Sequence, residues 1–117
     1  MAQPNSANVV AFPGRKPGQV GFVRDELTKI LDVYGRMVAA GHWRDYAMDF
    51  TKDVATFAAF VRHAERPQAR IEKRPSLRAK QGMWTLFGEQ GQVLKRGHEL
   101  AGVLAPLERR LLKAVDE

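Results

Sequence analysis

The spacing of apolar residues changes after Trp43, and this change restricts the fold more than any other feature. Between residues 22 and 40, apolar side chains recur every third or fourth position, with charged side chains on the opposite face. This spacing predicts an amphipathic helix that places one face on a core. Beyond Trp43, Tyr46, Met48 and Phe50 share one side of an alternating pattern, which predicts a half-buried strand. The chain therefore combines a helix with a sheet.

Gly35 lies in the middle of the predicted helix. Glycine in a helix interior costs up to about 1 kcal/mol relative to alanine. A glycine at such a position often has a packing reason. We therefore expect a close neighbour at Gly35.

The next segment, residues 54–62, fits both periods. A helix would align Phe57, Phe60 and Val61, whereas a strand would place Phe57 and Val61 on one face. A short turn at 51–53 joins this segment to the preceding strand, which favours a hairpin. We predict a strand here and keep the helix as the alternative.

Three more strands are predicted further along the chain. Residues 68–74 alternate until Pro75, which cannot donate a ladder hydrogen bond. Residues 83–87 are rich in aromatic and β-branched side chains. Residues 92–95 return after a glycine-bounded turn at 88–91. These segments predict an antiparallel meander of about five strands.

The last helical region begins near Gly97. Its apolar side chains form a stripe at helical spacing: Leu100, Val103, Leu104, Leu107, Leu111 and Val115. Proline in a helix interior removes a hydrogen bond and crowds the preceding turn. We therefore expect the C-terminal helix to be kinked at Pro106, or to divide into two abutting helices near Ala105.

Together these elements predict an α+β fold, with both helices on one face of the meander. We expect a single domain over residues 20–117. The predicted core residues are Trp43, Phe50, Phe57, Ile71, Leu86, Leu31 and Leu104. Residues 1–19 are rich in Pro, Gly, Ser and Asn and predict a flexible tail. The alternative for this tail is that VVAF at 9–12 docks as an edge strand.

Composition excludes several classes of protein. The 117 residues contain no cysteine, which excludes disulfides and thiolate metal sites. No apolar run approaches the roughly 18–20 residues of a membrane span. VVAF is too short for the apolar core of a secretory signal. We expect a cytoplasmic protein with no membrane partner.

The residues that most often carry catalysis are sparse. Ser6 lies in the tail and Ser76 in a basic linker, so a serine nucleophile paired with histidine has little support. His42, His63 and His98 show no metal-ligand spacing. We predict no catalytic residue and no cofactor.

Three carboxylates recur every four residues, at Asp45, Asp49 and Asp53. On a strand, Asp49 and Asp53 would lie about 13 Å apart, too far to share an ion. The chain also lacks the glycine motifs that bind nucleotide phosphates. We predict no metal site, and we expect that the protein is not an enzyme.

Residues 66–80, RPQARIEKRPSLRAK, hold most of the excess charge. Six basic side chains and one acidic side chain give this segment a net charge of +5, against +6 for the whole chain. Such a cluster can follow a phosphate backbone, and Trp84 would offer a stacking face for a base. Two interpretations without a binding function stay open. Trp84 is then a core residue, and the basic side chains only solvate one face of the protein. The predicted nucleic-acid-binding residues are Arg66, Arg70, Lys73, Arg74, Arg78, Lys80, Trp84, Lys95 and Arg96.

Nucleic acid is the predicted partner, and an acidic protein surface is the alternative. In that alternative the protein is an interaction or adaptor module that uses the basic face and the C-terminal helix. Leu107 and Leu111, with Arg109, Arg110 and Lys113 beside them, would form a partner-facing helix end or a homodimer contact. Charge alone does not separate DNA, RNA and protein as partners.

Four strings carry a family resemblance: YGRMVAAGHWRDYAMDF at 34–50, RIEKRP at 70–75, QG at 81–82 and LKRGHEL at 94–100. With them the chain resembles the alphaproteobacterial family known as domain of unknown function 2794, from about residue 22 to residue 104. The resemblance implies a small cytosolic bacterial protein. It assigns no functional residue.

Overall fold

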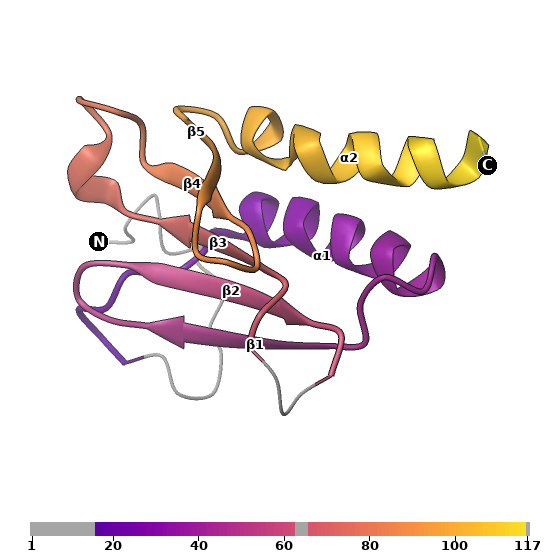
Figure 1. Cartoon of the computed structure of the whole chain (residues 1–117). Coiled ribbons are helices and arrows are strands. Elements are labelled where there is room, and N and C mark those ends of the chain that lie inside the picture. Colours follow the sequence, from indigo (N-terminus) through magenta and orange to yellow (C-terminus); the bar gives the residue numbers. More distant parts are fainter. Residues whose placement is uncertain (1–15, 63–65, 117) are drawn as a thin grey trace.

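The computed structural model describes residues 16–62 and 66–116 (Figure 1). Most of the predicted tail, including VVAF, lies outside the described residues. Lys16 and Gln19 form a turn, in which the Gln19 amide donates to the Lys16 carbonyl at 3.2 Å. The Val20 amide then donates to the Thr51 carbonyl at 2.8 Å, which ties the start of the domain to a turn of the sheet.

The described residues form a helix, five strands and a second long helix, with one short 3₁₀ turn between strands (Figure 1). Their bounds are α1 Arg24–Ala39, β1 Asp45–Phe50, β2 Ala55–Phe60, β3 Ala69–Lys73, η1 Pro75–Leu77, β4 Trp84–Phe87, β5 Val93–Gly97 and α2 Leu100–Asp116.

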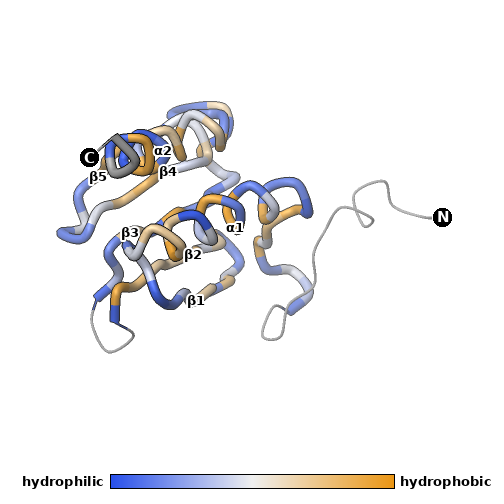
Figure 2. The backbone as a smooth tube through the Cα atoms, turned by 90° about the vertical axis from the view of Figure 1, so that its right-hand side faces the viewer, coloured by the Kyte–Doolittle hydropathy of each residue, from blue (hydrophilic) through white to orange (hydrophobic). Residues whose placement is uncertain are grey.

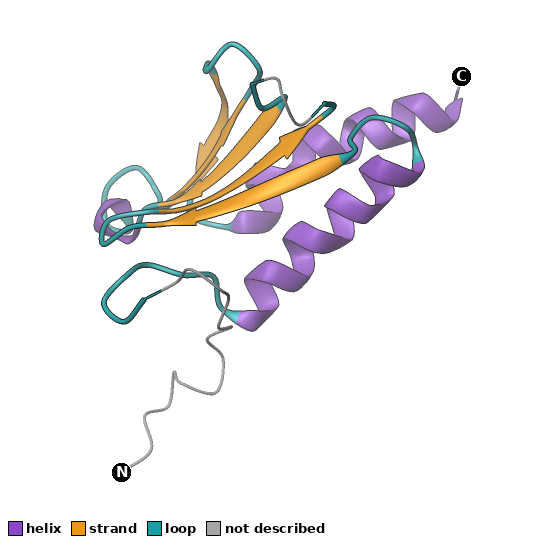
Figure 3. Ribbon diagram, turned by 90° about the horizontal axis from the view of Figure 1, so that it is seen from below, coloured by secondary structure: helices purple, strands orange, loops and turns teal. Residues whose placement is uncertain are grey.

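The sheet is an antiparallel meander in the order β1-β2-β3-β4-β5. Both long helices lie side by side on one face of this sheet (Figure 3). The α+β prediction is confirmed, and so is the strand at 54–62. The turn at 51–54 explains the hairpin: Thr51 Oγ1 accepts hydrogen bonds from the amides of Asp53 at 3.2 Å and Val54 at 3.1 Å. These bonds satisfy turn amides that no strand partner can reach.

Helix α1 begins after Val23, whose amide donates to the Glu26 carboxylate at 2.9 Å. This is one half of a capping box, and it places a negative charge in the first turn, where the helix dipole favours it. The helix ends at Ala39, and Gly41 follows the C-cap residue Ala40 with a φ of +83°, which suits a residue without a Cβ. Hydrophobic and hydrophilic stretches alternate along both helices, as expected for helices with one buried face (Figure 2).

The two helices are also joined at their surface. Arg36 on α1 donates from Nη2 to Glu108 Oε1 at 2.6 Å and from Nη1 to Glu108 Oε2 at 2.9 Å. The same guanidinium reaches Asp32 at 2.9 Å on its own helix. Exposed pairs contribute little each, but a bidentate pair fixes orientation. The contact joins the two helices at their exposed surface, away from the sheet.

The core lies between the helices and the inner face of the sheet. Cross-strand register places buried side chains of four strands on that face, among them Phe50, Phe57, Ile71 and Leu86. Six of the seven predicted core residues are buried, whereas Leu31 is only half-buried at the rim. Leu31 misses the core because Ile30 and Val33 point more directly at the sheet.

Two expectations about the helices are wrong: the division of the C-terminal helix and the packing role of Gly35. Helix α2 runs through Pro106 as one element, so the alternative of two abutting helices near Ala105 is excluded, whereas a kink at Pro106 stays a prediction. A Cβ built on Gly35 meets nothing within 4 Å, so this glycine does not serve close packing. The apolar stripe of α2 explains the first result, because burial on both sides of the proline offsets one lost hydrogen bond.

Candidate nucleic-acid interface

Strand β3 divides the basic segment between the two faces of the sheet. Its side chains alternate, with Ala69, Ile71 and Lys73 buried toward the helices and Arg70 and Glu72 on the opposite face. Both long helices lie on the inner side (Figure 3). No long helix of the described residues covers the outer face, where Arg96 is exposed, and Arg70 and Arg74 are partly exposed. Thr85, on the same face, is only 5% exposed beneath its neighbours.

Lys73 belongs to the core. Its Nζ donates to the Gly21 carbonyl at 2.8 Å and to Glu26 Oε1 at 2.7 Å, and the residue is 6% exposed. The ammonium also lies 5.9 Å from the centroid of the Trp84 ring. A buried charge needs such partners, because desolvation otherwise costs several kcal/mol. Lys73 links β3 to the start of α1 and cannot reach a ligand on the outer face.

Trp84 is buried as well, at 2% exposed, and stacks on Phe22 with ring centroids 6.3 Å apart. The predicted contact roles of Lys73 and Trp84 are therefore wrong. The structure supports the alternative interpretation given above, in which Trp84 is a core residue. Register with β3 decides the matter, because Trp84 is the cross-strand partner of Lys73 and shares its inner face.

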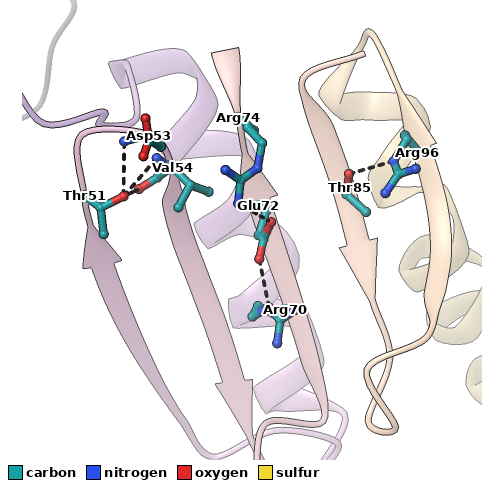
Figure 4. Close-up of polar contacts among 8 residues, drawn as sticks. All are labelled: Thr51, Asp53, Val54, Arg70, Glu72, Arg74, Thr85 and Arg96. Carbon is teal, nitrogen blue, oxygen red and sulfur yellow. Dashed lines mark hydrogen bonds and ion pairs between the residues drawn. The ribbon is translucent and has the colours of Figure 1, made fainter. Parts of the chain in front are cut away.

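On the outer face, Glu72 holds two arginines of the same strand region (Figure 4). Its carboxylate lies 3.3 Å from Arg70 Nε and 3.7 Å from Arg74 Nη2. The Arg70 Nε has no aligned hydrogen bond, so its contact with Glu72 is an ion pair only. The Arg70 guanidinium also lies over the Phe87 ring, 4.3 Å from its centroid. Two neighbours therefore fix the plane of this guanidinium.

A third arginine reaches the same face from β5. Arg96 donates from Nε to Thr85 Oγ1 at 3.2 Å (Figure 4). Its Nη1 donates to Gln81 Oε1 at 2.7 Å. Register aligns Arg96 with Thr85, and Thr85 with Glu72. We call Arg70, Glu72, Arg74, Thr85, Phe87 and Arg96 the outer basic face.

The loop after β3 adds two exposed cations beside this face. The amide of Leu77 donates to the Arg74 carbonyl at 3.0 Å, and the amide of Arg78 donates to the Pro75 carbonyl at 3.0 Å. These bonds wind the chain into η1 directly beyond Arg74. Arg78 and Lys80 are exposed there, and neither forms an ion pair within the described chain. We call residues 75–82 the basic loop.

Gly82 determines where the basic loop returns to the sheet. Its φ is +98°, and an added Cβ would lie 2.3 Å from the carbonyl carbon of Gly97. The backbones of the loop and of the end of β5 are therefore in direct contact, which only glycine permits. Two of the strings that carried the family resemblance, QG and LKRGHEL, meet at this contact.

The remaining predicted residues lie elsewhere. Arg66 precedes the opposite end of β3 from Arg74. Lys95 is the register partner of Leu86 and therefore points to the inner side, at the exposed edge strand β5. The structure brings together Arg70, Arg74, Arg78, Lys80 and Arg96, and it separates them from Arg66, Lys73, Trp84 and Lys95.

Glu72, Thr85 and Phe87 are the parts of this site that the predicted contact residues omit. The alternation within residues 83–87 could have located Phe87, because Trp84 and Leu86 face inward and Thr85 and Phe87 face outward. The outer face is also polarised. Asp45 and Asp49 occupy outward positions of β1, whereas the arginines lie on β3 and β5.

Among residues 16–62 and 66–116, no group of three or more His, Asp and Glu side chains is placed to hold a metal ion. Neither long helix in this part of the chain is long and apolar enough to cross a membrane. Of the two leucines considered above for a partner contact, Leu107 is a core residue of α2, like Leu100, and Leu111 is half-buried. Leu112 is 66% exposed at the far end of this helix.

Residues 20–104 match the family model described as "Protein of unknown function (DUF2794)". The match covers well over half of the chain, so the chain belongs to this family. Comparisons with curated proteins and with solved structures found no match.

Proposed function

We propose that this protein is a non-enzymatic binding protein whose outer basic face and basic loop contact a nucleic-acid backbone. One observation carries the proposal. Arg70 of β3, Arg74 directly after β3 and Arg96 of β5 lie on the side of the sheet away from both long helices, and the adjoining loop adds two exposed cations. Arginine suits such a role because its planar guanidinium forms paired hydrogen bonds with phosphate oxygens.

The ion pairs of Glu72 determine which cations can contact a phosphate without first losing a partner. Glu72 neutralises part of the charge of Arg70 and Arg74 in the free protein. These partly exposed pairs hold the arginines weakly, so a phosphate can take the place of the carboxylate. The exposed Arg78 and Lys80 need no such exchange and would make the first contacts.

Salt dependence gives the expected signature. Between three and five engaged cations predict a logarithmic salt slope of about −2 to −3.5 for a single strand and about −3 to −4.5 for a duplex. Sequence preference should be weak, because phosphate contacts position a protein without reading bases. The measurement is fluorescence anisotropy with labelled RNA and DNA over about 50 to 200 mM salt.

The test uses two variants with the same change in net charge. The outer variant is Arg74→Glu/Arg78→Glu/Lys80→Glu, and the helix-layer control is Arg24→Glu/Arg109→Glu/Lys113→Glu. We expect the outer variant to lose binding and to flatten the single-strand salt slope by about 2. The control should keep most of the affinity. Equal loss in both variants, or no binding by the wild-type protein at low salt, would overturn the proposal.

A second candidate rests on Leu112, the most exposed of the large apolar side chains in the described chain. We propose, as the alternative, that the end of α2 binds a protein partner or a second copy of this chain, with the outer basic face facing an acidic protein. Sedimentation equilibrium of wild-type protein and of Leu112→Glu tests the homodimer. A monomer that binds nucleic acid would count against this candidate.

A further inference from the structure

The outer basic face carries a flat aromatic and guanidinium surface in addition to its charge, and this surface bears on which nucleic acid would bind. Resting on the proposed function, we infer that the Phe87 and Arg70 pair is a stacking platform for an unpaired base, so that single strands are bound in preference to duplexes. The ligand class is single-stranded RNA or DNA.

The position of Phe87 is the first step. This aromatic side chain lies at an outward position of β4, on the side of the sheet that no described helix covers, and it is half-buried. An aromatic ring on an open face exposes apolar area to water unless a partner covers it. Phe87 is separated by a single position from Thr85, the hydroxyl partner of Arg96.

The fixed plane of Arg70 is the second step. Its guanidinium lies 4.3 Å from the Phe87 centroid and 3.3 Å from Glu72, so that its orientation is set before any ligand arrives. Bases in single-stranded nucleic acid stack on aromatic rings and also on arginine planes. A platform that is already ordered loses less side-chain entropy on binding. The Arg70 Nη atoms donate no hydrogen bond within the described chain, so they remain available for a phosphate or a base edge.

The neighbours of the platform are the third step. Ala58 is the register partner of Arg70 across β2, and Ala47 is the partner of Ala58 on β1. Neither side chain extends past its Cβ beside Arg70, and Ala58 is 9% exposed. Phe60 is a second half-buried aromatic at an outward position of β2. A single strand can therefore lie across the sheet with its bases against the surface.

Charge complementarity selects nucleic acid among the possible occupants. Arg74 and Arg96 flank the platform, and the basic loop continues the positive surface beyond it. A duplex has its bases already paired and stacked, so it would contact only the cations. Neither long helix of residues 16–62 and 66–116 lies on this face, where it would have to be to enter a major groove. The stacking contact is therefore specific to unpaired bases.

The test compares a labelled single strand of about 12 nucleotides, within the range of site sizes of known single-strand binders, with the same strand paired to its complement. We expect the single strand to bind the wild-type protein more tightly. Phe87→Leu should weaken single-strand binding about 5- to 150-fold, the equivalent of one stacked base. Its salt slope and its duplex affinity should stay unchanged.

Two further variants keep the test decisive. Phe87→Tyr preserves the ring and should retain wild-type affinity. Tyr46→Leu removes an exposed aromatic at the inner side of edge strand β1 and should have no effect on binding. Thermal melts of all variants show whether each is folded.

The outcomes separate this inference from the proposed function. Equal binding of single strand and duplex, or unchanged single-strand binding by Phe87→Leu, overturns the stacking platform while the backbone-binding proposal stands. If the wild-type protein binds neither nucleic acid, both are overturned, and an acidic protein surface becomes the better candidate for the outer basic face.

Discussion

Lys73 and Arg74 are adjacent in sequence and carry the same charge, yet they belong to different regions of the molecule. Lys73 faces the helices, where Glu26 and the Gly21 carbonyl surround its ammonium. Arg74 lies on the outer side, where Glu72 reaches it at 3.7 Å and much of the side chain meets solvent. A strand turns consecutive side chains to opposite faces, so a dense basic segment is divided into structural and accessible charges. Charge density along a sequence therefore overstates the charge on any one surface.

The largest expected effect tests how the basic loop is attached to the outer face. Gly82→Ala should lower the free energy of unfolding by about 3 kcal/mol or more, because its Cβ would overlap the Gly97 backbone and its φ is positive. Gly91→Ala is the matched control, since its φ is +79° but its Cβ would meet nothing within 4 Å. Denaturant unfolding of both variants measures the difference. Equal losses would show that the contact with Gly97 adds nothing to the strain of the backbone.

The second prediction contrasts the two regions at adjacent residues. Lys73→Met should cost about 2 kcal/mol, because it leaves Glu26 and the Gly21 carbonyl without their buried partner. Arg74→Met should cost less than about 0.5 kcal/mol, as most surface substitutions do. For nucleic-acid affinity we expect the opposite: Arg74→Met should bind more weakly than the wild-type protein, and Lys73→Met should bind equally well. A similar loss of stability in the two variants would contradict the division of the segment.

The smallest expected effect is a change in stability caused by a substitution in helix α1. It would provide a more stable protein in which to test the binding variants. Gly35→Ala should raise the free energy of unfolding by about 0.5–1 kcal/mol, because glycine costs helix stability and the added Cβ is unobstructed. Nucleic-acid affinity should not change, since Gly35 lies on the far side of the sheet. A loss of stability would indicate a neighbour at Gly35 that the structure lacks. If the gain is found, Gly35→Ala allows charge reversals on the outer face to be tested in a more stable protein.

The sequence predicted the order of elements well because each element has its own apolar period. The helix before Trp43 and the alternating strands after it are both visible as spacing. Phe57 and Ile71 were predicted to be core residues, and they are partners across β2 and β3. The alternative of a division near Ala105 is wrong, because tertiary burial of α2 outweighs the one amide hydrogen bond that Pro106 cannot form.

The candidate site was predicted less well, because it depends on register. Alternation within residues 68–74 separates Arg70 and Arg74 from Lys73, but only pairing with β4 shows that Trp84 joins Lys73 and Phe87 joins Arg70. The ion pairs of Glu72 require side-chain geometry as well. Register and rotamers arise from packing over the whole sheet, which no local pattern contains.

The central claim is that the outer side of the sheet, and not the helix layer, is the nucleic-acid surface. The most direct test is a titration of isotope-labelled protein with a short single strand, followed by amide chemical shifts in nuclear magnetic resonance spectra. We predict perturbations at Arg70, Arg74, Arg78, Thr85 and Arg96, and little change along α1 and the exposed face of α2. Perturbations centred on the helices, or none at all, would contradict the account.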